Sequence, residues 1–163
     1  VAPSGSYSTA FKSPFLRQGP NGTLIFELVS EQASSTGIPV VFTQSDVRAV
    51  QLAKGALRTG IDLLCREHNI QRPCKILLAG AFGSYLQKAD ILRIGMLPKV
   101  PEEDIVIVGN AAGVGAILAL CDEDYFNEAK ELAQKTQAFE LASPPDFQNA
   151  FVANLSFPNE QDV

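Results

Sequence analysis

Two short apolar runs, each followed at once by glycine, constrain the fold of this chain more than any other feature. Residues 75–79 read KILLA and lead into GAFGS, and residues 104–109 read DIVIVG and lead into NAAGVGA. Continuous apolar runs of this length are typical of strands buried on both faces of a parallel sheet. We therefore predict two such strands, each of which leaves the sheet through a glycine-rich exit that opens toward a helix.

Three antiparallel strands are predicted ahead of these exits, at residues 15–18, 23–31 and 38–43. The second alternates apolar residues, the third is rich in β-branched residues, and the turn sequences GPNG and QASSTG separate them. Residues 1–14 are small, polar and proline-containing, which predicts a flexible entry.

A long helix should follow the third strand. Thr43 or Ser45 can cap it, Asp46 would lie in its first turn, and Asn69 would end it. Its apolar stripe has three- and four-residue spacing and consists of Val47, Val50, Leu57, Ile61 and Leu64.

Two glycines interrupt this helix, Gly55 and Gly60, and Lys54 precedes the first of them. A glycine inside a helix costs about 1 kcal/mol relative to alanine. We therefore expect another part of the chain to pack closely against the helix at these positions.

Alternating helices and strands complete the chain. The predicted elements are a short helix at 86–95, a small-residue helix at 110–120, an amphipathic helix at 123–136 with Phe126, Ala129, Leu132 and Ala133 facing inward, a last strand at 138–142 and a helix at 144–155. The fold class is therefore α/β, with a mixed sheet in a single domain over residues 1–163 and a frayed tail at 159–163.

Composition excludes several classes of function. The chain has 13 basic and 18 acidic residues, a net charge of −5 and no block of Lys or Arg, which argues against binding to nucleic acid or to an anionic membrane surface. No run is long and apolar enough to span a membrane, and no secretory signal pattern is present. The absence of an initiator Met suggests an excised fragment or a processed product.

Metal and hydrolase sites are not predicted. Cys65, Cys74 and Cys121 have neither C-x-x-C spacing nor an even count, so we expect buried thiols in a reducing, cytoplasmic compartment. His68 is interpreted as a cation near a helix C-terminus. No G-x-S-x-G motif is present, and no catalytic residue is assigned.

The two glycine-rich exits are the candidate ligand site, because open α/β sheets bind ligands at the carboxyl ends of their strands. Neither exit matches a Walker loop or the dinucleotide motif. The alternative is that the glycines only permit close packing of a helix on a sheet, and we favour it for Gly113 and Gly115.

The two exits resemble motifs of the superfamily that contains acetate and sugar kinases, heat-shock chaperones and actin. ILLAGAFGS resembles its adenosine motif, and GNAAGVGAILAL resembles its second connecting helix. Each half of that superfamily's fold is ribonuclease-H-like, with three antiparallel strands and then alternating helices and strands. The resemblance therefore implies the element order that the sequence pattern predicts.

Six blocks in order, from Phe42 to Pro158, resemble the C-terminal region of the reductive activators of corrinoid proteins. They are FTQSDVRAVQLAKGALRTGIDLL, LLAGAFGSYL, ADILRIGMLP, VGNAAGVGA, FELA and FVANLSFP. Those activators are iron–sulfur ATPases that restore inactivated cobalt centres for methyl transfer. The chain lacks the superfamily's Asp-x-Gly-Thr/Ser phosphate turn, the acidic second phosphate motif and the activators' cysteine cluster. The resemblance thus implies only the C-terminal, adenosine-side half, without a complete catalytic site.

Carried onto this chain, the resemblance implies a nucleotide site. The nucleoside face would consist of Gly80, Ala81, Phe82 and Gly83. Ser84 could donate a hydrogen bond, and Lys54 and Arg58 of the long helix could cover the adenine. For Lys54 the alternative is a basic stem that covers apolar surface, and for Phe82 it is a core position.

The resemblance implies ATP or ADP with Mg²⁺ in the parent protein, and an iron–sulfur cluster outside this chain. Implied partners are the N-terminal half and iron–sulfur domain of the parent chain, and a corrinoid protein. The alternatives are a small-molecule kinase, an activator of acyl-CoA dehydratases, or a non-catalytic interaction module. The last would leave an exposed apolar face on the helix that bears Ala111, Ala112 and Gly115.

Overall fold

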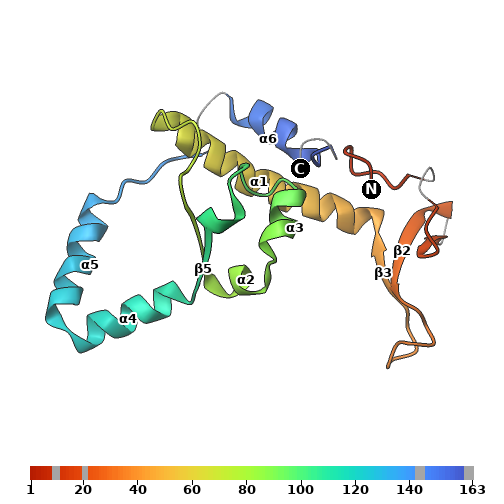
Figure 1. Cartoon of the computed structure of the whole chain (residues 1–163), viewed down its shortest axis with the longest axis horizontal. Coiled ribbons are helices and arrows are strands. Elements are labelled where there is room, and N and C mark those ends of the chain that lie inside the picture. The colour runs from red at the N-terminus through yellow and green to blue at the C-terminus, as the bar shows by residue number, and fades with distance from the viewer. Residues whose placement is uncertain (9–11, 20–21, 142–145, 160–163) are drawn as a thin grey trace.

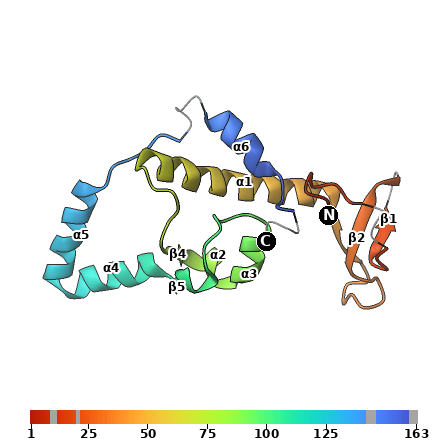
Figure 2. The ribbon, with the colours of Figure 1, turned by 45° about the horizontal axis from the view of Figure 1, so that its top comes forward.

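The computed structural model describes residues 1–8, 12–19, 22–141 and 146–159. Its elements are β1 (Leu16–Gln18), β2 (Leu24–Val29), β3 (Val40–Thr43), α1 (Gln44–Glu67), β4 (Ile76–Ala79), α2 (Gly80–Tyr85), α3 (Lys88–Arg93), η2 (Glu102–Asp104), β5 (Ile105–Gly109), α4 (Ala111–Cys121), α5 (Glu123–Lys135) and α6 (Phe147–Leu155). Helix α1 is the axis of the molecule (Figure 1). The antiparallel strands lie at one end of α1, α6 lies along it, and α4 and α5 stand away from it, which Figure 2 shows from a second direction.

The strands form two sheets. β1, β2 and β3 form an antiparallel sheet in that order, and β4 pairs with β5 in parallel. The predicted strand order and directions are confirmed, but the two sheets share no ladder in the described residues. The predicted strand at 138–142 is wrong over residues 138–141, which pair with no neighbouring strand, and residue 142 lies outside the described residues.

Helix α1 begins and ends where the sequence predicts. The Thr43 hydroxyl accepts a hydrogen bond from the Asp46 backbone N–H, and the Asp46 carboxylate accepts one from the Thr43 N–H at 2.7 Å. This capping box lowers the pKa of Asp46, because the backbone and side chain of Thr43 donate to the ionised carboxylate. After the helix, Asn69 adopts a left-handed φ of 55°, which stops further helical propagation.

The core is small and lies between α1, α3 and one face of the β4–β5 pair. Its buried members are Ile91, Met96, Leu97, Val100 and Ile105. Ile76 and Leu78 of β4 and Ile61 of α1 pack against this cluster. The opposite face of β4 is open, and Leu77 is 61% exposed there. The prediction of strands buried on both faces is therefore wrong for this chain, because no described element covers the second face.

Helices α4 and α5 also expose apolar side chains. In α5, Phe126 and Leu132 are exposed, so the predicted inward orientation is wrong, because among the described helices α5 packs mainly on α4. Cys74 and Cys121 are exposed and Cys65 is partly buried, which corrects the expectation of buried thiols. None of the helices in the described ranges is long and apolar enough to cross a membrane.

Candidate functional site

The two glycine-rich exits lie side by side at the carboxyl edge of the β4–β5 pair. Ala79 at the end of β4 is aligned with Gly109 at the end of β5. Gly80, which follows Ala79, has a φ of +89°, and Gly109 has a φ of +63°. An ideal Cβ built on either glycine would have no atom within 4 Å. Both exits therefore use glycine for its backbone conformation and leave open space in front of it.

The two glycines of GAFG differ in role. Gly83 is buried, and a Cβ there would lie 3.2 Å from the Cβ of Leu78, so this glycine permits α2 to pack closely on β4. The segment is the short helix α2 rather than a simple turn. Ala81 is exposed at its start. The side chains of Phe82 and Ser84 lie outside what the structure describes, so their predicted roles stay predictions.

The second exit begins α4 with a side-chain cap. The Asn110 carboxamide oxygen accepts a hydrogen bond from the Gly113 N–H at 3.0 Å. A Cβ on Gly113 would lie 2.4 Å from the Asn110 Nδ2, whereas one on Gly115 would have no atom within 4 Å. The predicted helix–sheet packing is therefore absent at both glycines among the described residues. Gly113 makes room for the cap, and Gly115 faces open space.

Lys54 and Arg58 lie on α1, one turn apart. Lys54 is 2% exposed; its Nζ donates to the Ser156 carbonyl and lies 5.2 Å from the centre of the Phe157 ring. Burial, and then the charge of Arg58, lower the pKa of Lys54 to about 8. In the Arg58 guanidinium, NH1 donates to the Leu97 carbonyl at 2.9 Å. Lys54 is therefore hydrogen-bonded to the C-terminal tail, and Arg58 is hydrogen-bonded to the loop after α3 and to Asp62 of α1.

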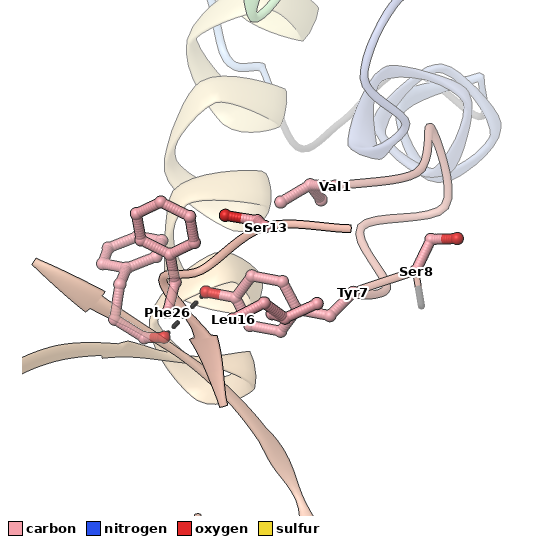
Figure 3. Close-up of a pocket in the computed structure, with 7 residues that line it drawn as sticks. Val1, Tyr7, Ser8, Ser13, Leu16 and Phe26 are labelled. Atoms are coloured by element: carbon pink, nitrogen blue, oxygen red, sulfur yellow. Dashed lines mark hydrogen bonds between the residues drawn. The ribbon is translucent and has the colours of Figure 1, made fainter. Parts of the chain in front are cut away.

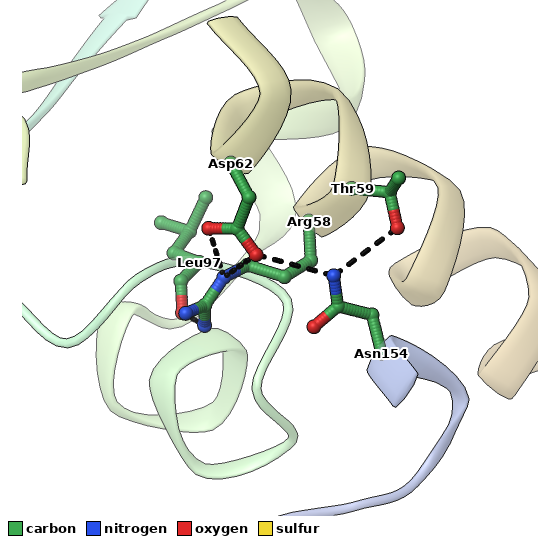
Figure 4. A network of polar contacts seen from close by, with 5 residues as sticks. All are labelled: Arg58, Thr59, Asp62, Leu97 and Asn154. Carbon is green, nitrogen blue, oxygen red and sulfur yellow. Dashed lines mark hydrogen bonds and ion pairs between the residues drawn. The ribbon is translucent and has the colours of Figure 1, made fainter. Parts of the chain in front are cut away.

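A polar network fastens α6 to α1 (Figure 4). Asn154 donates from Nδ2 to the Thr59 hydroxyl and to the Asp62 carboxylate, both at 3.1 Å, and Arg58 Nε donates to that carboxylate at 2.9 Å. Thr59 is fully buried in this contact. The pattern of apolar residues did not predict this network, because its partners are about ninety residues apart in sequence.

The glycine at position 55, inside a helix, is the sequence feature that indicated the contact between α1 and α6. A Cβ on Gly55 would lie 3.1 Å from Leu155 Cδ2 and 3.3 Å from the Asn154 carbonyl oxygen. The expectation of close packing is confirmed there. At Gly60 a Cβ would lie 3.5 Å from Leu141 Cδ1, which is ordinary contact.

The N-terminal segment is also held on α1. Arg48 NH1 donates to the Ser4 carbonyl at 2.8 Å, and the Phe157 N–H donates to the Pro3 carbonyl at 2.9 Å. Tyr7 donates its hydroxyl proton to the Phe42 carbonyl at 2.7 Å beside a cavity of about 360 Å³ (Figure 3). These contacts tie part of the expected flexible entry to the body of the molecule.

No cluster of three or more His, Cys, Asp or Glu side chains that could hold a metal ion occurs in the described part of the chain. The candidate site is the β4–β5 edge with Gly80 and Gly109, where backbone rather than side chains borders the open space.

Comparison with known proteins identifies the family of this chain. Residues 1–163 match the family model described as the C-terminal domain of RACo, the ASKHA domain. A corrinoid activation enzyme, RamQ of Eubacterium limosum, is 35% identical over 139 residues, which cover 84% of this chain and 23% of that protein. A solved reductive activator for a corrinoid, iron–sulfur protein superposes with a TM-score of 0.84 at 28% identity, covering 98% of this chain and 26% of that one.

The chain thus spans about a quarter of the length of both relatives. The family match, which extends over the whole chain, agrees with the resemblance carried by the two glycine-rich exits and with the observed strand order. The chain belongs to the family of C-terminal ASKHA domains of the reductive activators of corrinoid proteins.

Proposed function

We propose that this chain is the adenosine-side, ATP-binding part of a longer iron–sulfur reductive activator that restores inactivated corrinoid proteins for methyl transfer. The observation that carries the proposal is the pair of positive-φ glycines at the β4–β5 edge, Gly80 and Gly109, with open space where a Cβ would stand. A backbone without side chains lets a nucleoside approach closely. The carboxyl edge of parallel strands is the usual place for such a ligand.

The residues fit the nucleoside better than they fit the whole nucleotide. Gly80 and Ala81 supply an open backbone surface, whereas Gly83 is buried against Leu78 and Lys54 is buried under the C-terminal tail. We therefore assign Lys54 to the fastening of the tail. The phosphates and Mg²⁺ would be held by the N-terminal half of the parent protein, and ATP would drive domain closure only to the extent that it binds the closed state better.

The test is calorimetric titration of the full-length protein with ATP and ADP. We expect saturable binding, and we expect Gly80→Ala to weaken it at least about tenfold, because the added Cβ occupies the space proposed for the nucleoside. Gly37→Ala is the matched control. Gly37 also has a positive φ, +68°, and open space around its Cβ, but it lies in the turn between β2 and β3.

Two results would contradict the proposal. The first is absence of ATP and ADP binding by the full-length protein. The second is equal weakening by Gly80→Ala and Gly37→Ala, which would assign the effect to backbone strain. Failure of the isolated 163-residue chain to bind is compatible with the proposal, since the phosphate-binding half is then missing.

The exposed helix α4 supports the predicted partnership with the N-terminal half of the parent. None of its residues is buried; Ile117 is 62% and Leu120 is 86% exposed. A helix that is apolar all round is normally buried. The matched relatives are about four times longer than this chain, so we assign the preceding polypeptide as the segment that covers α4.

Ile117→Lys tests this assignment. The change should leave the thermal stability of the isolated chain within about 0.5 kcal/mol, because the side chain is exposed there. In the full-length protein it should destabilise the folded state by about 2 kcal/mol or more, because a buried charge replaces a buried apolar group. If full-length wild type and full-length Ile117→Lys were equally stable, the assignment would be contradicted. That result would favour the alternative that α4 binds a separate partner protein.

A further inference from the structure

An exposed aromatic ring, that of Tyr85, lies one short helix away from the proposed nucleoside edge. Tyr85 ends α2, which begins at Gly80, and its side chain is 86% exposed. None of the other aromatic side chains that the structure describes is as exposed. A tyrosine ring offers a large apolar contact area at a low cost in conformational entropy, which is why such rings are common in binding surfaces.

The residues on either side of Tyr85 hold it on the outer side of α2. Gly83 faces the strands, because a Cβ on it would lie 3.2 Å from the Leu78 Cβ. Residues two apart on a helix differ by about 200° in direction, so Tyr85 faces away from β4. The next residue, Leu86, packs against the buried core cluster. Tyr85 is therefore held outward between two residues that face inward.

Ala81 lies on the same outer face of α2 as Tyr85, because residues four apart share one face of a helix. Ala81 is also exposed. Long side chains on a helix lean back toward its N-terminus, over the residue four positions earlier. We therefore expect the Tyr85 ring to lean over Ala81, toward Gly80 and the β4–β5 edge. The small side chain of Ala81 leaves the face of the ring uncovered.

We propose that Tyr85 stacks on the base of the bound nucleotide. This role rests on the nucleoside site proposed at the β4–β5 edge, and it adds a side chain to a site bordered by backbone. From Gly80 to Tyr85 a helix rises by about 7.5 Å, so a ribose at Gly80 places the base within reach of a ring that leans back. Base–aromatic stacking uses the π-face of the base, so Tyr85 contributes affinity without contacting the phosphates.

The test is calorimetric titration of the full-length protein and its Tyr85 variants with ATP. Tyr85→Ala should weaken ATP binding about tenfold, within the range found when one base–aromatic stack is removed. Tyr85→Phe keeps the ring and should bind ATP within about twofold of the wild type. A merely structural role is tested separately: the melting temperature of the 163-residue chain should be the same with Tyr85→Ala as without it, because the side chain is exposed.

Tyr125→Ala is the matched control. It removes another exposed tyrosine, which lies on α5, so ATP binding should be the same as in the wild type. Equal weakening by Tyr85→Ala and Tyr125→Ala would overturn the assignment, because the effect would then not depend on position.

The titrations also separate this inference from the proposed function. If ATP binds, and Gly80→Ala weakens it but Tyr85→Ala does not, the nucleoside site stands and the stacking role of Tyr85 is overturned. Equal weakening by Tyr85→Phe and Tyr85→Ala would overturn that role as well, because the ring itself would then contribute nothing. Absence of ATP binding by the wild type would overturn the proposed function and, with it, the role of Tyr85.

Discussion

Lys54 should make the stability of this chain depend on pH in an unusual direction. The side chain is 2% exposed and its pKa is lowered from 10.5 to about 8, first by burial and then by Arg58. In the folded state the charged form is therefore disfavoured relative to the unfolded state. The two states bind the same number of protons well below pH 8, and the unfolded state binds more protons between pH 8 and 10.5.

The free energy of unfolding should consequently rise as pH increases through this window. A pKa difference of this size corresponds to about 3 kcal/mol in total, most of which should be gained between pH 7 and pH 10. The effect is isolated by comparison with Lys54→Met, which retains an unbranched stem and removes the titrating group. Other groups that titrate in the window, such as Tyr7, cancel in the comparison.

Urea denaturation of both proteins at several pH values between 7 and 10 measures the difference. The unfolding free energy of the wild type should rise relative to that of Lys54→Met by about 2–3 kcal/mol across the series. Lys75→Met, which removes a charge from an exposed position, should show no such gain and controls for net charge. A difference between wild type and Lys54→Met that stays constant from pH 7 to pH 10 would refute the reasoning.

Three other predictions concern helix α1. Gly60→Ala should raise the unfolding free energy by about 0.5–1 kcal/mol, since the new Cβ makes only ordinary contact with Leu141 and glycine is a poor helix former. Gly55→Val should lower the unfolding free energy by about 2 kcal/mol or more, because even a Cβ at this position would be in close contact with α6 and the valine side chain is larger. Equal effects of the substitutions at Gly55 and Gly60 would contradict the packing of α6 on α1. Thr43→Ala should cost about 1 kcal/mol by removing the cap, and thermal denaturation measures all three.

Local features of this fold could be predicted from the sequence because they depend on neighbouring residues. The cap at Thr43, the stop at Asn69 and the ends of the two strands beside Gly80 and Gly109 all follow from side-chain chemistry or backbone freedom within a few positions. Long-range features could not be predicted in the same way. The burial of Lys54 depends on a tail about a hundred residues further along the chain.

The errors about which apolar surfaces are buried share one physical cause. An apolar pattern shows that a surface must be covered, but it does not show that the covering polypeptide is in the same chain. The open face at Leu77 and the exposed apolar side chains of α4 and α5 each have a pattern typical of a buried surface. Their exposure in the described residues is what we expect if, as proposed, another part of a longer parent protein covers them. The same reasoning places the proposed nucleoside site at an edge where covered and uncovered surfaces meet, since β4, whose second face is open, ends at Ala79, immediately before Gly80.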